Sequence, residues 1–379
     1  GEGNTGNVTN ARLSELISLT QRMHPLLTIT ADVRIPYSTT LQLSRGDSNN
    51  AWSNILNEIN VLRVSEGTGR QYVGVLRDNG AGSGIAGIGY RPGRSILSLD
   101  ENYASEIVAH ELGHNWNRPH SPCGGPAGVD PSYPYPEGNI GVYGYDPLSG
   151  FIQTPDVPDV MSYCRLNINF NLNVPRRWIS DYTYTMVMNY RAVFPDAPTT
   201  NSALQDCLIV WGRVTNGKVI LEPSFTTMTV PSLPRGRGAL TLSGRNASGS
   251  ILYSLSFDAS PVADLPSTEG HFAFAIPVSS VPVSQISRFE LAAPGRAPSV
   301  QEMRSDNTAP SIRASQARSG FTRIQWDAAK NPLIVMRDPV TREILSLARS
   351  GDAVVRTSGK AFEVIASNGV RSARAQIRQ

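Results

Sequence analysis

The stretch HELGHNWNRPH, residues 110–120, constrains this chain of 379 residues more than any other. It holds three of the five histidines of the chain. On a helix, His110 and His114 share one face, where two neutral imidazoles can bind one zinc ion. His120 can supply a third ligand, and Glu111 lies where it can take a proton from water. Three protein ligands leave one coordination position open, which is typical of a catalytic zinc site.

The pentapeptide HELGH is a weak signal by itself, because an exposed helix can carry two histidines at this spacing by chance. The third histidine strengthens the signal, and so does DVMSYC at residues 159–164. Together the two stretches resemble the metzincin pattern, HExxHxxGxxH followed by a Met-containing turn. Residues 102–190 resemble secreted bacterial zinc proteases with C-terminal β-sandwich modules, a group that includes enzymes acting on mucin-type glycoproteins. The resemblance implies an α+β catalytic domain with a twisted mixed sheet and an active-site helix.

One position departs from the metzincin pattern, since Asn117 stands where that pattern has glycine. The glycine is needed because the helix ends there and the chain turns back with a positive φ toward the third histidine. Asparagine tolerates the left-handed region better than most residues do. We therefore expect Asn117 to preserve the turn.

The resemblance implies roles for two further residues. Met161 is expected to pack beneath the imidazoles without binding the metal; the alternative is an ordinary core methionine. Tyr163 matches a tyrosine that, in astacin-like and serralysin-like metzincins, reaches the zinc or stabilises the tetrahedral oxyanion. The alternative for Tyr163 is a buried structural tyrosine.

The resemblance also suggests how the three cysteines are used. Cys123 follows His120 by three residues and Cys164 follows Met161 by three, and in a metzincin these landmarks are stacked beneath one metal. We therefore expect a Cys123–Cys164 disulfide and an unpaired Cys207, as in an exported protein. The alternative is three reduced cysteines in a protein that is not exported.

Apolar periodicity predicts helices at 10–23 and 49–64 and strands at 26–35, 71–76 and 95–99. Asp100 is a candidate cap for the active-site helix, and Glu106 on that helix is either an acceptor behind the metal ligands or a solvated carboxylate. The glycine-rich residues 84–89 are either an edge strand that pairs with extended substrate, as in metzincins, or a hairpin without substrate contact. His24 and His271 are expected to be surface or packing residues.

After a linker at 194–201 the sequence changes to short apolar strands separated by turns, beginning with a hairpin around Asn216-Gly217. We expect a catalytic domain at 1–195 and an Ig-like β-sandwich at 196–300. Residues 301–379 are either a second small β-domain or a continuation of the first. The composition of the linker predicts that 1–195 folds and cleaves small peptides by itself.

A net charge of +3 does not suggest a nucleic-acid-binding protein, and no apolar run is long enough to cross a membrane. Together with the resemblance, these features predict a secreted or extracellular monomer, with the cell surface as an alternative location. It would use one catalytic Zn²⁺ to hydrolyse protein or glycoprotein substrates, with Glu111 as the general base. The alternatives are an inactive glycan- or surface-binding protein with a protease-like domain, and a zinc enzyme whose third ligand is a downstream carboxylate.

Overall fold

The computed structural model describes residues 5–78, 82–196, 203–234, 237–265, 269–306, 310–357 and 361–378. Its N-terminal part contains the helices α1 (Asn10–Met23), α2 (Ala51–Glu66), α3 (Ala104–Asn115) and α4 (Asp181–Val193). A mixed three-stranded sheet has the order β1 (Tyr72–Leu76), β3 (Ser95–Leu99), β2 (Gly87–Gly89). The central strand β3 is parallel to β1 and antiparallel to β2. The edge position predicted for the glycine-rich stretch therefore belongs to β2.

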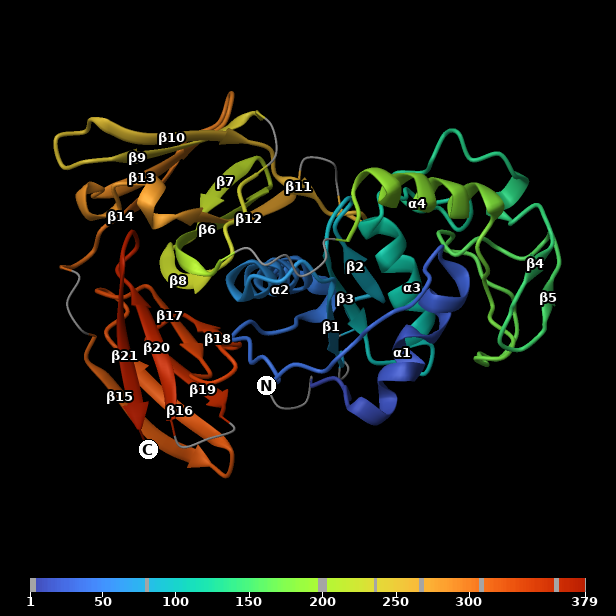
Figure 1. Cartoon of the computed structure of the whole chain (residues 1–379), viewed down its shortest axis with the longest axis horizontal. Helices are drawn as coiled ribbons and strands as arrows, with labels where there is room; N and C mark the ends of the chain where they lie inside the picture. The colour runs from blue at the N-terminus through green and yellow to red at the C-terminus, as the bar shows by residue number, and fades with distance from the viewer. Residues whose placement is uncertain are drawn as a thin grey trace.

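The sheet separates α2 from α3, because side chains alternate between its two faces. On β3, Ile96 packs with Val108 and Leu112 of α3, whereas Leu97 packs with Leu56 and other residues of α2. Figure 1 shows the sheet between these two helices. A short hairpin of β4 (Gly144–Tyr145) and β5 (Ile152–Gln153) lies in the long Pro/Gly/Tyr-rich loop that precedes α4.

Two local predictions were wrong. Residues 26–35 form no strand, because no described strand pairs with their backbone. Leu27 is 96% exposed, and the backbone N–H of Ile35 donates to the Glu343 carboxylate. Asp100 does not cap α3, whose N-cap is Tyr103. The Asp100 carboxylate instead accepts from Asn7 N and from the guanidinium of Arg12.

The prediction of a β-sandwich after the linker is confirmed. Two sheets enclose a common apolar core, with the orders β10-β9-β13-β14 and β11-β12-β6-β7; β8 also pairs with β6. The predicted hairpin joins β6 to β7, with left-handed backbone at Asn216 (φ 47°) and Gly217 (φ 73°). The strands are β6 (Gln205–Thr215), β7 (Lys218–Leu221), β8 (Phe225–Thr229), β9 (Leu240–Arg245), β10 (Ile251–Phe257), β11 (Ser260–Pro261), β12 (Gly270–Pro277), β13 (Arg288–Ala292) and β14 (Ser299–Glu302).

A second sandwich with its own core follows. Its sheets have the orders β15-β16-β19 and β18-β17-β20-β21, and apolar side chains from both sheets meet between them. The strands are β15 (Ile312–Arg318), β16 (Phe321–Trp326), β17 (Leu333–Arg337), β18 (Ile344–Ala348), β19 (Asp352–Arg356), β20 (Ala361–Ser367) and β21 (Ser372–Arg378).

Helix α2 joins the N-terminal part to both sandwiches through a third apolar core. Strand β6 is buried on both faces: Leu208 and Val210 point into the first sandwich, and Ile209 and Trp211 point toward α2. Strand β17 behaves in the same way, which explains why both strands read as continuous apolar runs. The members of the third core from α2 are Val61, Leu62 and Val64, and those from the second sandwich are Leu333, Val335, Ile344, Leu347 and Ile365.

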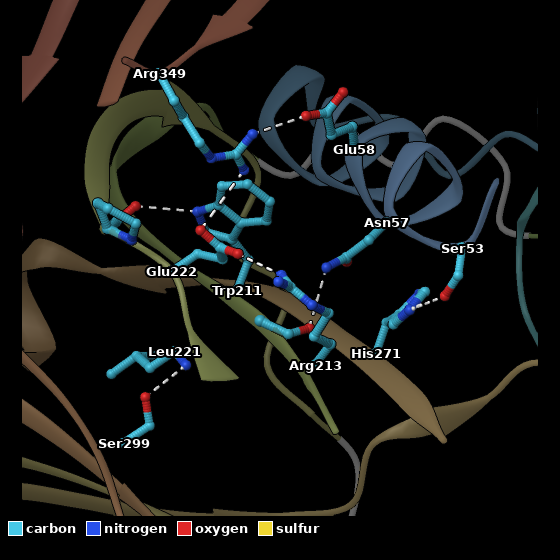
Figure 2. A network of polar contacts seen from close by, with 12 residues as sticks. Ser53, Asn57, Glu58, Trp211, Arg213, Leu221, Glu222, His271, Ser299 and Arg349 are labelled. Carbon is cyan, nitrogen blue, oxygen red and sulfur yellow. Dashed lines mark hydrogen bonds and ion pairs between the residues drawn. The ribbon is translucent and has the colours of Figure 1, made fainter. Parts of the chain in front are cut away.

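Polar contacts on α2 reinforce this junction (Figure 2). Asn57 Nδ2 donates to the backbone oxygen of Gly212 at 3.1 Å, and Glu58 forms an ion pair with Arg349 at 3.0 Å. His271 of β12 lies 2.9 Å from the Ser53 hydroxyl and 2.8 Å from the Tyr90 hydroxyl. Among the residues that the structure describes, no helix is long and apolar enough to cross a membrane.

The buried His271 predicts acid sensitivity of this junction. Burial, with a contribution from the charge of Arg213, lowers the pKa of His271 to about 3, whereas an unfolded histidine titrates near 6.5. The unfolded state therefore binds more protons as the pH falls below about 6.5. His271 should thus reduce the free energy of unfolding by up to about 1.4 kcal/mol per pH unit on acidification.

Denaturant titrations of the full chain and of His271→Gln between pH 6.5 and pH 4 measure this contribution. The variant should lose stability less steeply with falling pH, whatever its stability at pH 7. Equal slopes for the two proteins would show that His271 is not the group that responds.

Candidate metal centre

Helix α3 and the turn after it bring the three histidines of HELGHNWNRPH together. His110 and His114 lie on one face of α3, and Asn117 takes a left-handed conformation with φ 65°. Asn117 N donates to His114 O at 2.8 Å and Arg118 N donates to Gly113 O at 3.0 Å, the two bonds of a Schellman motif. Asn117 thus makes the turn that glycine usually makes, and the chain returns with His120 under the helix.

The three imidazoles converge through their Nε2 atoms. The Nε2 of His114 lies 3.1 Å from that of His110 and 3.1 Å from that of His120, and all three rings are buried. Two nitrogens bound to one tetrahedral zinc ion are separated by about 3.3 Å, given zinc–nitrogen bonds of about 2.0–2.1 Å. The observed spacing fits a metal ion held between them.

Hydrogen bonds at the opposite ring nitrogens fix the tautomers. The Nδ1 atoms of His110, His114 and His120 lie 2.7, 2.6 and 2.6 Å from the backbone oxygens of Val160, Arg118 and Ala127. A carbonyl oxygen can only accept, so each Nδ1 donates its proton, and in the neutral ring each Nε2 is then the atom with the free lone pair. Three lone pairs aimed at one point repel one another unless a cation lies between them.

Burial also keeps the rings of His110 and His114 in the neutral form that binds metal ions. It is the largest cause that lowers the pKa of His114 to about 4 and the pKa of His110 well below its usual range. Both imidazoles are therefore neutral at pH 7, as metal binding requires.

A fourth potential ligand, Asp264, comes from the first sandwich. Its Oδ1 lies 3.1 Å from His120 Nε2 and accepts a hydrogen bond from the Tyr163 hydroxyl at 2.6 Å. Ligand atoms of the three histidines and Asp264 all lie within 4.8 Å of one another, so the cluster could hold a metal ion. The sequence analysis missed Asp264, which follows His120 by 144 residues and lies in an ordinary loop sequence, PVADLP.

Glu111 lies beside this cluster, against the edge strand β2. Its side chain is buried, and its Oε2 has no hydrogen-bond partner among the described residues. A Cβ at Gly87 would lie 2.6 Å from Glu111 Oε1, and one at Gly89 would lie 3.2 Å from Oε2. The glycines of β2 therefore leave the space that the carboxylate occupies. Burial, together with the negative charge of Asp264, raises the pKa of Glu111 well above its usual range.

Met161 and Tyr163 have different surroundings. Met161 is buried beneath α3, where a Cβ at Gly113 would collide with its Sδ. Tyr163 is 42% exposed, and its ring centroid lies 4.9 Å from that of His120. The structure thus places Tyr163 at the solvent side of the cluster and not in a core.

The predicted disulfide between Cys123 and Cys164 is confirmed, and Cys207 is free and buried in β6. The bridge spans 41 residues and could stabilise the fold by about 4 kcal/mol through loop entropy. It ties the residues after His120 to the residues after Met161, close to the histidine cluster.

Of the two alternatives for Glu106, the solvated carboxylate is wrong, because the side chain is buried. It accepts from the backbone and guanidinium of Arg176, with a shortest distance of 2.7 Å. This ion pair joins α3 to the segment before α4. His24 and His271 are both buried packing residues, and His24 Nε2 lies 2.9 Å from Ala109 O.

Comparisons with known proteins add little to this geometry. Neither a protein-family model nor a curated protein matches the chain. The CD2-binding domain of CD58 (lymphocyte function-associated antigen 3) is similar over 39% of this chain and 89% of its own, with 11% identity and a TM-score of 0.17. The BSP domain of a biofilm associated protein is similar over 47% of this chain and 29% of its own, with 11% identity and a TM-score of 0.15. At these scores neither likeness bears on fold or function.

Proposed function

We propose that this chain is a zinc-dependent endopeptidase of the metzincin type. The observation that carries the proposal is the set of three Nε2 atoms that converge beside the buried carboxylate of Glu111, whose Oε2 has no partner among the described residues. A zinc ion in this position supplies Lewis-acid chemistry, polarising a peptide carbonyl and making water more acidic. The intramolecular disulfide fits an oxidising, extracellular compartment.

Residues of the chain supply proton transfer, transition-state stabilisation and substrate binding. Glu111 takes the proton of the attacking water and returns it to the leaving amine. The Tyr163 hydroxyl donates a hydrogen bond to the oxygen that becomes negative in the transition state. The edge of β2 offers backbone groups to an extended peptide, next to Glu111. The substrate is a protein, and the resemblance to mucin-type glycoprotein proteases makes glycoproteins the first class to test.

The test is hydrolysis of casein and of an O-glycosylated mucin by the purified full chain. Cleavage should stop when 1,10-phenanthroline removes the metal and should return when Zn²⁺ is added in excess. Cleavage that survives the chelator would contradict the proposal. No cleavage of either substrate by the zinc-loaded protein would favour the alternative of a binding protein with a protease-like domain.

Tyr163→Phe is expected to lower turnover by about ten- to a hundredfold with little change in KM, because one donor to the oxyanion is lost. The measurement is steady-state hydrolysis of a fluorogenic peptide. Tyr135→Phe is a matched control, since the Tyr135 hydroxyl bonds Asp181 outside the histidine cluster. An equal loss in both variants would mean that Tyr163 acts only through packing.

A further inference from the structure

A segment of the first sandwich lies along the edge of β2 and ends at the metal cluster. Val262 forms an antiparallel bridge with Tyr90, the residue that follows β2. Ala263 N donates to Gly89 O at 2.9 Å, and Arg91 N donates to Pro261 O at 3.0 Å. Residues 261–263 therefore use backbone groups at the end of the edge strand that an extended peptide would also use.

The next residue, Asp264, presents an oxygen to the groups expected to hold the reacting oxygen of a substrate. The same atom, Oδ1, lies 3.1 Å from His120 Nε2 and accepts from the Tyr163 hydroxyl at 2.6 Å. The second oxygen, Oδ2, is buried and has no hydrogen-bond partner among the described residues. A carboxylate held this close to three imidazoles, with its own Oδ2 and Glu111 Oε2 both buried without a partner, is explained if a cation completes the group.

We propose that residues 261–264 are an internal plug that closes the metal site, with Asp264 as a displaceable fourth ligand. The inference rests on the proposed function, because it assigns to Asp264 the coordination position that a hydrolytic water needs. Backbone pairing with the end of β2 holds the segment in place, and the carboxylate excludes water and substrate from the metal. The chain becomes active when a substrate or a change in the first sandwich draws residues 261–264 away.

The fraction of molecules in which residues 261–264 have left the metal site, the open form, determines how much the plug weakens ligand binding. For a ligand that binds only the open form, the apparent Kd equals the intrinsic Kd divided by the fraction of molecules that are open. If the open form is about a tenth of the molecules or less, removing the plug strengthens ligand binding by about tenfold or more.

Three full-length proteins test the plug: the parent chain, Asp264→Ala and Asp264→Asn. Asp258→Ala is the matched control. It removes one negative charge, and the bond that Asp258 accepts from Ala239 N, from the turn between β10 and β11, outside the metal cluster. Each protein is loaded with Co²⁺, and its visible absorption spectrum and its affinity for acetohydroxamate are measured. Both Asp264 variants should retain the metal, change the spectrum and bind acetohydroxamate about tenfold more tightly or better, whereas Asp258→Ala should match the parent.

Peptide hydrolysis by the zinc-loaded proteins separates this inference from the proposed function. A changed Co²⁺ spectrum and tighter acetohydroxamate binding in proteins that cleave no peptide would support the plug and contradict the protease. Chelator-sensitive cleavage with an unchanged spectrum and unchanged acetohydroxamate affinity in both Asp264 variants would support the protease and overturn the plug. Loss of Co²⁺ from both variants would also overturn it, since Asp264 would then be a permanent ligand.

Discussion

Glu111→Ala is expected to lower peptide turnover by about three orders of magnitude while the fold and the bound metal persist. The carboxylate is buried beside the histidine cluster and has an oxygen without a partner. Its removal therefore takes away the proton acceptor but leaves no protein donor unsatisfied. The three imidazoles keep their hydrogen bonds to the backbone, so metal binding should not fall.

The measurement is turnover of a fluorogenic peptide at saturating substrate, together with metal content and thermal stability. Glu101→Ala is a suitable control, because it removes an exposed carboxylate just before α3. A Glu111→Ala protein that keeps more than about a tenth of the parent turnover would mean that another group is the base. Loss of metal or of the fold along with activity would assign Glu111 a structural role.

A fragment that ends at residue 196 is expected to lose its cooperative fold, contrary to the independence that the linker composition suggested. In the complete chain, Val61, Leu62 and Val64 of α2 are buried against both sandwiches. Exposing three such side chains costs about 1.5–3 kcal/mol each, a large part of the roughly 5–15 kcal/mol that stabilises a typical domain. The contacts of Ser53, Asn57 and Glu58 with the two sandwiches would be lost as well.

Near-ultraviolet circular dichroism and denaturant titration of the 5–196 fragment test this expectation. The fragment should lack a cooperative transition, and mixing it with a separately produced 203–378 fragment should restore one. A soluble 5–196 fragment that unfolds cooperatively and cleaves small peptides would show that the catalytic part folds and functions without the contacts between α2 and the sandwiches.

Local chemistry accounts for the parts of this molecule that the sequence could predict. The i, i+4 histidines, the tolerance of Asn117 for a left-handed turn and the Asn216-Gly217 hairpin each depend on a few neighbouring residues. The disulfide was predicted through family resemblance, which placed Cys123 and Cys164 near one metal. The failed strand at 26–35 shows the limit of such patterns, since alternation in sequence supplies no hydrogen-bonding partner.

Contacts between distant segments could not be predicted. Asp264 reaches the histidines only because the first sandwich packs on α2 and directs β11 toward β2, and its flanking sequence has no motif. The depth to which α2 is buried is also a tertiary effect, but its sequence contains a hint. Asn57 and Glu58 interrupt an apolar helix and are nevertheless buried, because each meets a partner on a sandwich.

Metal analysis tests the central claim most directly. The full chain, purified without chelators and dialysed against a metal-free buffer, should contain one zinc ion per molecule by plasma mass spectrometry. His120→Ala should retain far less zinc, because only two imidazoles would remain. Lys218→Ala, in which an exposed residue of the β6–β7 hairpin is changed, should retain the full amount. A full chain that binds no zinc, or a His120→Ala protein that retains all of it, would contradict the three-histidine centre.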